Sequence, residues 1–282
     1  MDRMNISGGL CQEAYALYLE AFPDYPVRQD SFAALWHSDA VTYHVASEGG
    51  HLIGFALTSG QSVTLLAVAN AYRRRGIGER LLKEAEHTIL ARGYRRIFIG
   101  RGEKYLLQGA PREHGEAIAF LEKRGYRATW ESADLVLTPE HLASVPTPQE
   151  ITLRYAEESD RDALLAVVDA VNHGWHRVFA ECREKSFIAL QGNEIVGFAA
   201  ISAEGGRFQR EGDGVGSIGC VGVLPREQNR GIGSYLVMGA AQTLFREGSF
   251  AIELRYVTRN SFYERLGFVC RHTQWMGEKN WD

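Results

Sequence analysis

The stretch VANAYRRRGIG at residues 68–78 occurs again, in altered form, as VLPREQNRGIG at residues 223–233. In each stretch an apolar run ends, a polar turn with basic residues follows, and Gly-x-Gly begins a long amphipathic segment. The pattern predicts a strand, a turn and a helix, with the helices running over Ile77–Arg92 and Ile232–Glu247. Backbone N–H groups at a helix start, with the positive end of the helix dipole, bind anionic oxygens. Each turn is therefore a candidate phosphate-binding site.

Simpler interpretations compete with phosphate binding at these turns. A Gly-x-Gly after a strand is most often a turn without a ligand, and basic residues such as Arg73–Arg75 usually form a solvated face. The turns are not dinucleotide fingerprints, because Leu81 and Leu236 occupy the position of the third glycine. The Gly-Lys-Ser/Thr of an ATPase phosphate loop is also missing. The recurrence of the whole unit, each time with basic residues in the turn, nevertheless favours phosphate binding.

Further matches on both sides of the turn indicate a tandem duplication. HLIGFA at 51–56 is echoed by EIVGFA at 194–199, an offset of 143, and FLEKRGY at 120–126 by FYERLGF at 262–268, an offset of 142. The Gly-x-Gly turn repeats at an offset of 155, and the order of the three matches is kept. The unequal offsets predict one insertion in each copy, at Arg101–Gly115 and at Glu204–Gly216.

A cluster of prolines marks the boundary between the copies. Three of the seven prolines fall within ten residues, from Pro139 to Pro148, and proline disfavours both helices and central strands. We therefore predict an N-terminal domain over residues 1–140, a linker over 141–150 and a C-terminal domain over 151–282. Alternating helices and strands in each copy predict an α/β fold with helices on both faces of a sheet. The predicted strands are Val41–Ser47, His51–Ser59, Val63–Val68 and Arg96–Ile99, then Ser186–Gln191, Glu194–Ala203, Ser217–Val223 and Ala251–Tyr256.

Length and composition narrow the classes of function. The 282 residues suffice for two domains, at roughly 100–200 residues each. Lys and Arg total 31 against 35 Asp and Glu, a net charge of −4, so no overall basic field is present to hold nucleic acid. No apolar run approaches the roughly 20 residues of a membrane helix. The four cysteines have no paired spacing, which indicates neither a disulfide framework nor a zinc ribbon and predicts a reduced, cytoplasmic protein. They are Cys11, Cys182, Cys220 and Cys270.

At the turns both copies resemble the Gcn5-related N-acetyltransferase (GNAT) superfamily, whose central motif is Gln/Arg-x-x-Gly-x-Gly/Ala. The first copy matches this motif from Arg73 to Gly78, and the second from Gln228 to Gly233. The resemblance implies two tandem GNAT-like domains, each a mixed, mostly antiparallel sheet flanked by helices. It also implies acetyl-CoA as cosubstrate, with its pyrophosphate on the turn and its pantetheine arm paired with the preceding strand. The cofactor-binding residues predicted in this way are Val68, Arg73, Arg74, Arg75, Gly76, Ile77 and Gly78, then Val221, Val223, Gln228, Asn229, Arg230, Gly231, Ile232, Gly233 and Asn260.

The two copies differ downstream of the main helix. The second copy has Asn260 and Tyr263 before its last Gly-Phe, an arrangement common in the family. The resemblance implies that Asn260 holds the pantetheine and that Tyr263 protonates the departing CoA thiolate, a task that suits a phenol with a pKa of about 10. The alternative is that Tyr263 is a core aromatic residue. The first copy has Ile118 and Leu121 at these positions, which cannot do this chemistry.

Other candidates for acid and base rest on weaker patterns. Tyr105 or Tyr126 could replace the missing phenol in the first copy, and the segment 105–111 either closes over the cofactor or is only a loop. Glu253, on the strand after the main helix, is the first candidate for the base that accepts the amine proton, with an exposed edge charge as the alternative. Three further polar residues lie on the opening helix and loop that line the acceptor site in this family, and we predict no metal site because no third ligand stands out beside the two histidines. They are Asp169, His173 and His176.

These patterns together predict an acyltransferase that moves an acetyl group from acetyl-CoA to a primary amine of a small molecule, with neither nucleic acid nor membrane as partner. The amine attacks the thioester directly, while N–H groups of the strand before the turn polarise its carbonyl. We expect the C-terminal domain to be catalytic, with Tyr263 as general acid. Three alternatives stay open: a catalytic N-terminal domain, a non-catalytic acyl-CoA-binding protein, and a transferase of aminoacyl or long acyl groups. The oligomeric state stays open as well.

Overall fold

The computed structural model describes residues 3–181, 185–203, 214–258 and 260–281, with side chains from residue 9 onward. Cys182 and most of the insertion predicted at Glu204–Gly216 lie outside the described residues. The chain packs into two compact units. The first contains Met1–Ser132 and His272–Asp282, and the second contains the described residues between Ala133 and Arg271.

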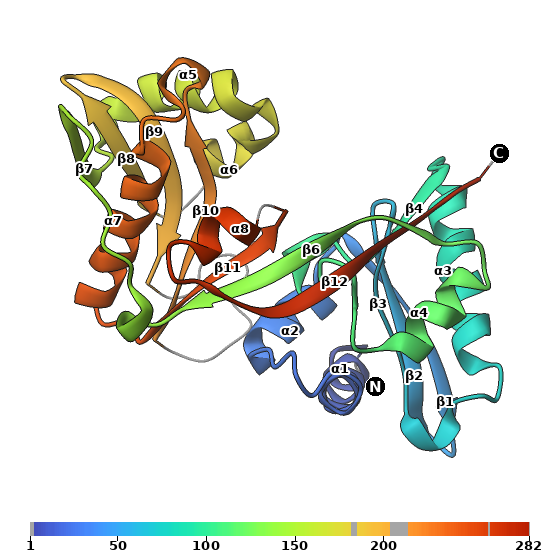
Figure 1. Ribbon diagram of the computed structural model, residues 1–282. Helices are drawn as coiled ribbons and strands as arrows, with labels where there is room; N and C mark the ends of the chain where they lie inside the picture. The colour runs from blue at the N-terminus through green and yellow to red at the C-terminus, as the bar shows by residue number, and fades with distance from the viewer. Residues whose placement is uncertain (1–2, 182–184, 204–213, 259, 282) are drawn as a thin grey trace. The chain divides into compact units, whose positions relative to one another are not determined.

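The first unit is a mixed sheet with helices on both faces (Figure 1). Its elements are α1 (Arg3–Ala21), α2 (Gln29–Trp36), β1 (Val41–Glu48), β2 (His51–Ser59), β3 (Ser62–Val68), α3 (Ile77–Ala91), β4 (Arg96–Ile99), β5 (Ala110–Pro111), α4 (Gly115–Glu122) and most of β12 (Val269–Asn280). The strand order is β1-β2-β3-β4-β12, and β5 pairs with another part of β12. β3 and β4 run parallel, and the other neighbouring strands are antiparallel.

Apolar side chains on both faces hold this sheet. α3 buries Leu81, Leu82 and Ile89 against one face, because positions three, four, seven and eight apart share one side of a helix. α1 and α2 bury Tyr18 and Phe32 against the other face. Each such side chain contributes roughly 1.5–3 kcal/mol when it leaves water.

The second unit repeats this architecture. Its elements are the second half of β6 (Arg127–Leu137), β7 (Ile151–Tyr155), α5 (Arg161–Asn172), α6 (His176–Glu181), β8 (Lys185–Gln191), β9 (Glu194–Ser202), β10 (Val215–Val223), α7 (Ile232–Arg246), β11 (Ala251–Val257) and α8 (Asn260–Glu264). The strand order is β6-β11-β10-β9-β8-β7, with only β10 and β11 parallel among the strands described. α7 covers one face through Leu236 and Leu244, and α5 and α6 cover the other through Val168 and Phe179 (Figure 1).

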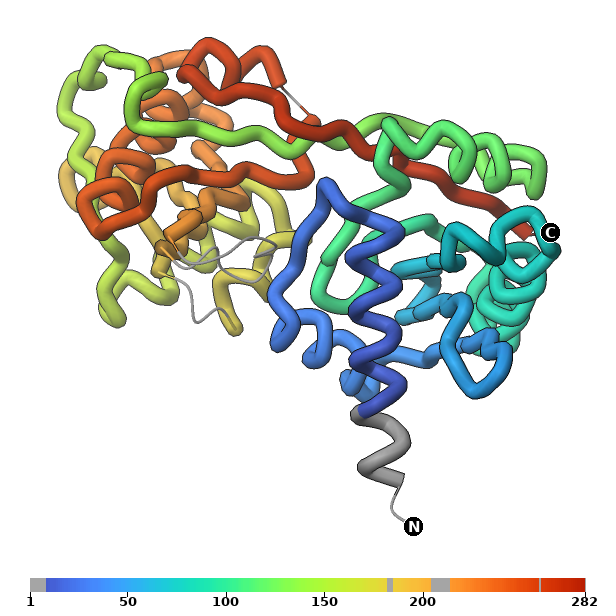
Figure 2. Tube along the Cα trace, turned by 90° about the horizontal axis from the view of Figure 1, so that it is seen from below, coloured from blue at the N-terminus to red at the C-terminus, as the bar shows by residue number. Residues whose placement is uncertain are grey.

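The last strand of each sequence copy pairs inside the unit formed mainly by the other copy. β6, which ends the first copy, pairs with β11, where Leu135 lies opposite Leu254. β12, which ends the second copy, pairs with β4, where Glu278 lies opposite Phe98. Trp275 of β12 is 1% exposed and belongs to the core cluster of the first unit. Figure 2 follows this red C-terminal stretch to its end in the first unit.

The predicted α/β class and the alternation of elements are confirmed. α3 ends at Ala91 where Arg92 was predicted, and β10 begins at Val215 where Ser217 was predicted. The predicted boundaries near residues 140 and 150 follow the repeat along the sequence, whereas the compact units exchange their last strands. These sequence boundaries stay a prediction.

Candidate active site

The two Gly-x-Gly turns have the same backbone conformation. Gly76 and Gly231 precede α3 and α7 with φ angles of 82° and 80°, in the left-handed region that glycine adopts without strain. Two positions earlier, Arg74 and Asn229 share a φ of 62°. Among the described residues no side chain caps either helix start, and the first helical bond of α3 runs from Arg80 N to Gly76 O. The preceding N–H groups lack an acceptor within the helix, which is the arrangement that binds anions.

The first residue of each motif ties the turn to the end of the strand before it. Arg73 Nε donates to the carbonyl oxygen of Val68 at 3.1 Å, and Gln228 Nε2 donates to that of Val223, also at 3.1 Å. Arginine and glutamine therefore do the same structural task, which explains why the motif accepts either residue.

The remaining basic residues of the turns are exposed and engaged in weak surface contacts. Arg74 pairs with Glu116 at 2.8 Å, with both side chains 82% exposed. Arg230 pairs with Glu227, and Arg75 stacks on a neighbouring tyrosine with its Cζ 4.9 Å from the ring centroid. Exposed ion pairs contribute only about 0–1 kcal/mol, so a phosphate would displace these partners at little cost.

The second glycine of each motif is not demanded by packing inside the protein. A Cβ at Gly78 would lie 3.6 Å from Val68 Cγ2, and one at Gly233 would lie 3.7 Å from Phe262 Cζ, both ordinary contact distances. Alanine would favour a helix by up to ~1 kcal/mol over glycine. A ligand that approaches the backbone would supply the missing reason for glycine. Between the glycines, Ile77 and Ile232 pack against the cores of their units.

The parallel strands beside each turn part before they reach it. In the described part of the chain, β3 pairs with β4 only at Ser62 and Val63, and β10 pairs with β11 only from Val215 to Ser217. β10 runs on to Val223, whereas β11 continues beside β6. The parting leaves a stretch of β10 whose backbone has no strand partner on the β11 side, and an extended ligand can pair there.

A bulge interrupts β10 within that stretch. The register with β9 shifts between Gly219 and Gly222, and Cys220 has a φ of 47°. A left-handed residue in a strand turns its neighbouring peptide groups away from the ladder, and such bulges are common beside active sites. Sequence analysis named Val221 and Val223 in this strand but missed Cys220. The glycines on both sides of Cys220 and Val221 were the available signal.

Tyr263 lies on a short helix that packs against the turn of the C-terminal copy. α8 begins with Asn260, and its Phe262 ring is the nearest group to the turn glycine, Gly233. The Tyr263 ring packs edge-on against Phe262 at 4.9 Å and against Phe268 at 5.8 Å, and remains half-buried. The two interpretations of Tyr263 are therefore not exclusive, because its ring packs at the border of the core.

Glu253 is a buried carboxylate in the middle of the sheet. It is 8% exposed and lies at the last residue pair of β11 with β10, opposite Ser217. The interpretation as an exposed edge charge is wrong, because β6 of the first copy covers the other side of β11. Its neighbours Ile252 and Leu254 face α7, so Glu253 faces the side of α5 and α6.

A buried ion pair that sequence analysis missed lies on the same strand pair. Arg255 and Asp134 are 5% and 1% exposed, with Nε and Oδ1 3.9 Å apart. Arg255 is two residues after Glu253, on the same side of β11. The signal was an aspartate within the apolar run from Ala133 to Leu137, where a charge needs a buried partner.

Comparison with known proteins decides what these features have in common. The model of the "Acetyltransferase (GNAT) family" matches the chain twice, over residues 9–126 and 149–268. Each match contains one Gly-x-Gly turn with its strand and helix. The chain belongs to the GNAT acetyltransferase family.

Relatives and solved structures agree with the two GNAT copies. A mycothiol acetyltransferase of Nocardia farcinica is 27% identical over 278 residues, covering 88% of this chain and 86% of its own. A GCN5-related glucosamine N-acetyltransferase region of a fungal multi-domain β-N-acetylglucosaminidase superposes with a TM-score of 0.86 at 20% identity, over 95% of this chain but 36% of that one. A tandem GNAT protein from the clavulanic acid pathway superposes with a TM-score of 0.71 at 14% identity, over 97% and 95%. The predicted family, tandem fold and N-acetyltransferase class are confirmed.

The N-terminal GNAT copy has apolar residues where the C-terminal copy has Asn260 and Tyr263. Ile118 and Leu121 of α4 are each 5% exposed. Tyr126 is fully buried and its hydroxyl donates to Glu86 at 3.0 Å, while burial and that carboxylate raise its pKa far above the usual value. Tyr126 is thus held in the core on the α3 side. Tyr105 is 40% exposed and is the more accessible of the two phenols considered for this GNAT copy.

The insertion predicted in the N-terminal copy follows β4 directly. Its backbone is fixed by hydrogen bonds from Gly100 N to Val63 O at 2.9 Å and from Arg101 N to Leu107 O at 2.8 Å. Leu106 and Leu107 are 2% and 3% exposed and join the core cluster of α1 and α2. This part of the insertion is core rather than a surface loop.

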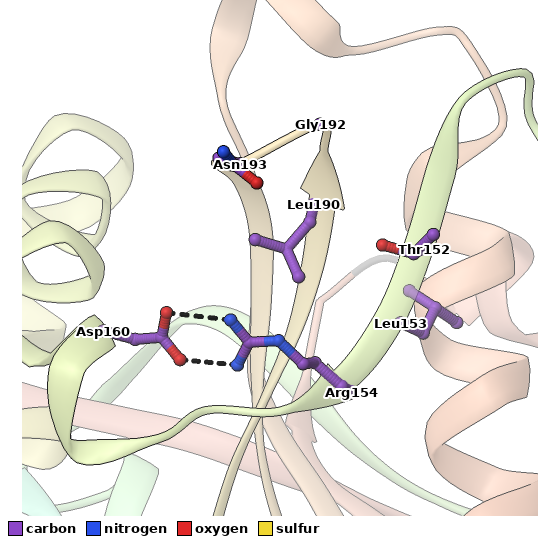
Figure 3. Close-up of a pocket in the computed structure, with 7 residues that line it drawn as sticks. All are labelled: Thr152, Leu153, Arg154, Asp160, Leu190, Gly192 and Asn193. Carbon is purple, nitrogen blue, oxygen red and sulfur yellow. Dashed lines mark hydrogen bonds and ion pairs between the residues drawn. The ribbon is translucent and has the colours of Figure 1, made fainter.

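One cavity of the second unit lies at the edge of its sheet (Figure 3). It has a volume of about 430 Å³ and lies between β7, the β8–β9 turn and the start of α5. The Arg154 guanidinium makes two hydrogen bonds with the Asp160 carboxylate across it, at 2.5 and 3.0 Å. β7 is three strands from β10 in the sheet order, so this cavity is separate from the cofactor turn. Its lining residues are Thr152, Leu153, Arg154, Asp160, Leu190, Gly192 and Asn193.

The helices of the protein are those of a packed core. Within the described residues, none is both long and apolar enough to cross a membrane.

Proposed function

We propose that the C-terminal copy transfers an acetyl group from acetyl-CoA to a primary amine of a small molecule. The observation that carries this proposal is the pairing of a phosphate-type turn with a phenol-bearing helix. α8 packs on the turn through Phe262, and the next residue is Tyr263. In the N-terminal copy the matching helix carries Ile118 and Leu121 instead.

The residues of the C-terminal copy fit the donor from end to end. The N–H groups at the start of α7, with Arg230 beside them, suit the pyrophosphate. The backbone of β10 that parts from β11, at Val221 and Val223, suits the amides of an extended pantetheine arm. Asn260 at the start of α8 is the side chain we assign to the same arm. The full set is Val221, Val223, Gln228, Asn229, Arg230, Gly231, Ile232, Gly233 and Asn260.

Acetyl-CoA supplies the acetyl group as a thioester. The neutral amine forms a bond to the carbonyl carbon, and the carbon–sulfur bond breaks. We assign the bulged backbone around Cys220 to polarising the carbonyl oxygen through N–H groups. The Tyr263 hydroxyl then gives its proton to the leaving sulfur, since a phenol is protonated at neutral pH.

Glu253 is the residue we assign to the amine proton. It lies where β10 and β11 part, on the side of the sheet that α5 and α6 cover. A carboxylate there accepts a proton directly or through one water molecule. Its burial at 8% exposure limits competition from bulk solvent.

The acceptor class rests on the relatives. The name mycothiol acetyltransferase supports a small-molecule acceptor rather than a protein side chain. We assign an accessory role to the N-terminal copy, in which Val68 and the turn from Arg73 to Gly78 bind CoA phosphates without turnover. The cytoplasmic location stays a prediction.

The variant Tyr263→Phe tests the assigned acid. We expect kcat to fall by roughly 10²–10⁴-fold, the usual contribution of a positioned proton donor, with acetyl-CoA affinity unchanged. Free thiol released from acetyl-CoA reports the rate across a panel of amines that includes glucosamine. Tyr105→Phe is the matched control in the N-terminal copy and should keep full activity.

Two outcomes would contradict the proposal. Full activity of Tyr263→Phe together with an inactive Tyr105→Phe would move the chemistry to the N-terminal copy. Binding of acetyl-CoA without thiol release for any amine would indicate an acyl-CoA-binding protein instead.

A further inference from the structure

A cluster of one carboxylate and two imidazoles lies at the end of α5, apart from the cofactor turn. Asp169 Oδ1 is 2.9 Å from His173 Nδ1 and 2.9 Å from His176 Nδ1. The second oxygen, Oδ2, is 3.0 Å from the same nitrogen of His176. The three side chains are 38%, 84% and 41% exposed, so the cluster opens to solvent.

The local fold brings these side chains together for clear reasons. His173 is four residues after Asp169, one helical turn along the same face. The chain then makes a 3₁₀ turn over His173–Trp175, in which the side chain of Asn172 accepts a hydrogen bond from Gly174 N at 3.0 Å. That turn returns the chain so that His176, at the start of α6, reaches the same carboxylate.

The loop that carries the cluster is anchored to the sheet. Trp175 packs edge-on against Phe198 of β9, with 6.2 Å between the ring centroids. Phe179 of α6 packs against the same ring at 5.0 Å. The backbone between the two histidines is therefore fixed, which reduces the entropy lost when their side chains bind a common ligand.

The cluster differs from the other histidine–carboxylate pairs of the described chain. His44 with Glu84, His141 with Glu140 and His272 with Glu113 each join one histidine to one carboxylate, at 3.9, 3.9 and 3.4 Å. Within the described residues, Asp169, His173 and His176 alone form a group of three whose ligand atoms all lie within 4.8 Å of one another. The hydrogen bond from His176 also holds the pKa of the Asp169 carboxyl below its usual value, so the carboxylate is ready to act as a ligand.

We propose that Asp169, His173 and His176 bind a divalent transition-metal ion, with Zn²⁺ the ion that suits them best. Two imidazole nitrogens and one carboxylate oxygen are a ligand set that zinc uses in sites with an open fourth position. Ligands around zinc lie roughly 3.4 Å apart, given bonds of about 2.0–2.1 Å, so small side-chain rotations suffice. The open position faces solvent. The bound ion cross-links α5 to α6, and its binding is independent of the acetyl transfer proposed above.

Calorimetric titration of Zn²⁺ tests the site in the full-length protein without a histidine tag, after chelator treatment and desalting. We expect one ion per chain. His173→Ala, His176→Ala and Asp169→Asn should each weaken the affinity by at least ~10-fold, the minimum loss expected when a ligand is removed. His141→Ala is the matched control, an exposed histidine of the same unit that faces one carboxylate, and should leave the affinity unchanged.

Cobalt substitution gives a second measurement that excludes the cysteines. Co²⁺ at a site of nitrogen and oxygen ligands shows weak visible bands without the strong near-ultraviolet band of a cobalt–thiolate bond. The visible bands should vanish in His176→Ala and persist in His141→Ala. The proposal is overturned by a thiolate band, by the absence of saturable binding, or by equal affinity in the ligand variants and the wild type. Circular dichroism of each variant verifies that the fold is retained.

Discussion

The two copies share a turn and differ in everything that follows the next strand. In both, a glycine with a φ near 80° leads into the main helix, and a side chain from the turn clamps the strand end at 3.1 Å. In the N-terminal copy β4 ends at Ile99, and the chain then buries Leu106 and Leu107 in the core. In the C-terminal copy β11 runs on to Val257 and leads to α8, which carries Tyr263.

This difference shows which part of the fold is common and which part is specialised. The turn is a backbone device, so it survives any change that keeps its glycines. The acid and base are side chains on elements that follow, and those elements diverged. A matched cofactor motif therefore does not establish turnover, and each copy needs its own test.

The largest effect is expected from the exchanged strand. Trp275 lies in the second sequence copy but is buried in the core of the first unit. Trp275→Ala should cost about 3–5 kcal/mol of unfolding free energy, the range for large aromatic residues. Hydrogen exchange should quicken in α3 and β4 and stay unchanged in α7.

The neighbouring Trp281 provides the control, because it is only half-buried. Trp281→Ala should cost clearly less. Faster exchange in α7 of the Trp275→Ala variant would instead assign the strand to its own sequence copy and break the comparison.

The next effect separates the two turns. Gly231→Glu places a carboxylate where we expect a pyrophosphate, and like charges in contact cost several kcal/mol, so kcat/KM should fall by roughly 10²–10³-fold. Gly76→Glu is closely matched, since its φ of 82° imposes the same backbone strain as the 80° of Gly231. It should leave the rate within about twofold and remove one acetyl-CoA site from a calorimetric titration.

Equal loss of activity in both glycine variants would show that turnover depends on both turns. Loss in Gly76→Glu alone would reverse the assignment of the catalytic copy.

The smallest effect concerns acid stability of the C-terminal copy. The Arg154 guanidinium, through two hydrogen bonds, holds the pKa of Asp160 below its usual value. A lowered pKa stabilises the fold above the unfolded-state value of about 3.9, and this contribution is lost as the pH falls through the folded-state value. Asp160→Asn should cost at most about 1 kcal/mol at pH 7, since the pair is partly exposed.

Urea unfolding between pH 7 and pH 2 provides the measurement. The difference between Asp160→Asn and the wild type should shrink below about pH 5. A constant difference over this range would mean that the carboxylate has no role as a charge.

Local patterns predicted the elements well. Alternating apolar residues and the glycine before each helix placed β2, β4 and the starts of α3 and α7 at the residues observed. These features depend on neighbours within one turn or one strand, and a short stretch of sequence contains all of them.

Features that depend on distant pairing could not be predicted. Glu253 looked like an edge charge because no local pattern shows that β6, more than 100 residues earlier, pairs with β11. The exchange of β6 and β12 was hidden for the same reason, since both strands follow the same short helix in their copies. His173 and His176 were recognised as a pair, yet their common partner Asp169 became evident only from the path of the 3₁₀ turn.

The exchange of last strands also orders events during synthesis. Arg96 of β4 pairs with Glu278 of β12 at 2.5 Å, a contact between residues 182 positions apart. The first sheet is complete only when nearly the whole chain has left the ribosome, and until then β4 presents an unpaired edge of the kind that promotes aggregation. A chain cut short near its C-terminus loses the support of its N-terminal half. Loss of the final residues would thus be felt first at the oldest part of the nascent chain.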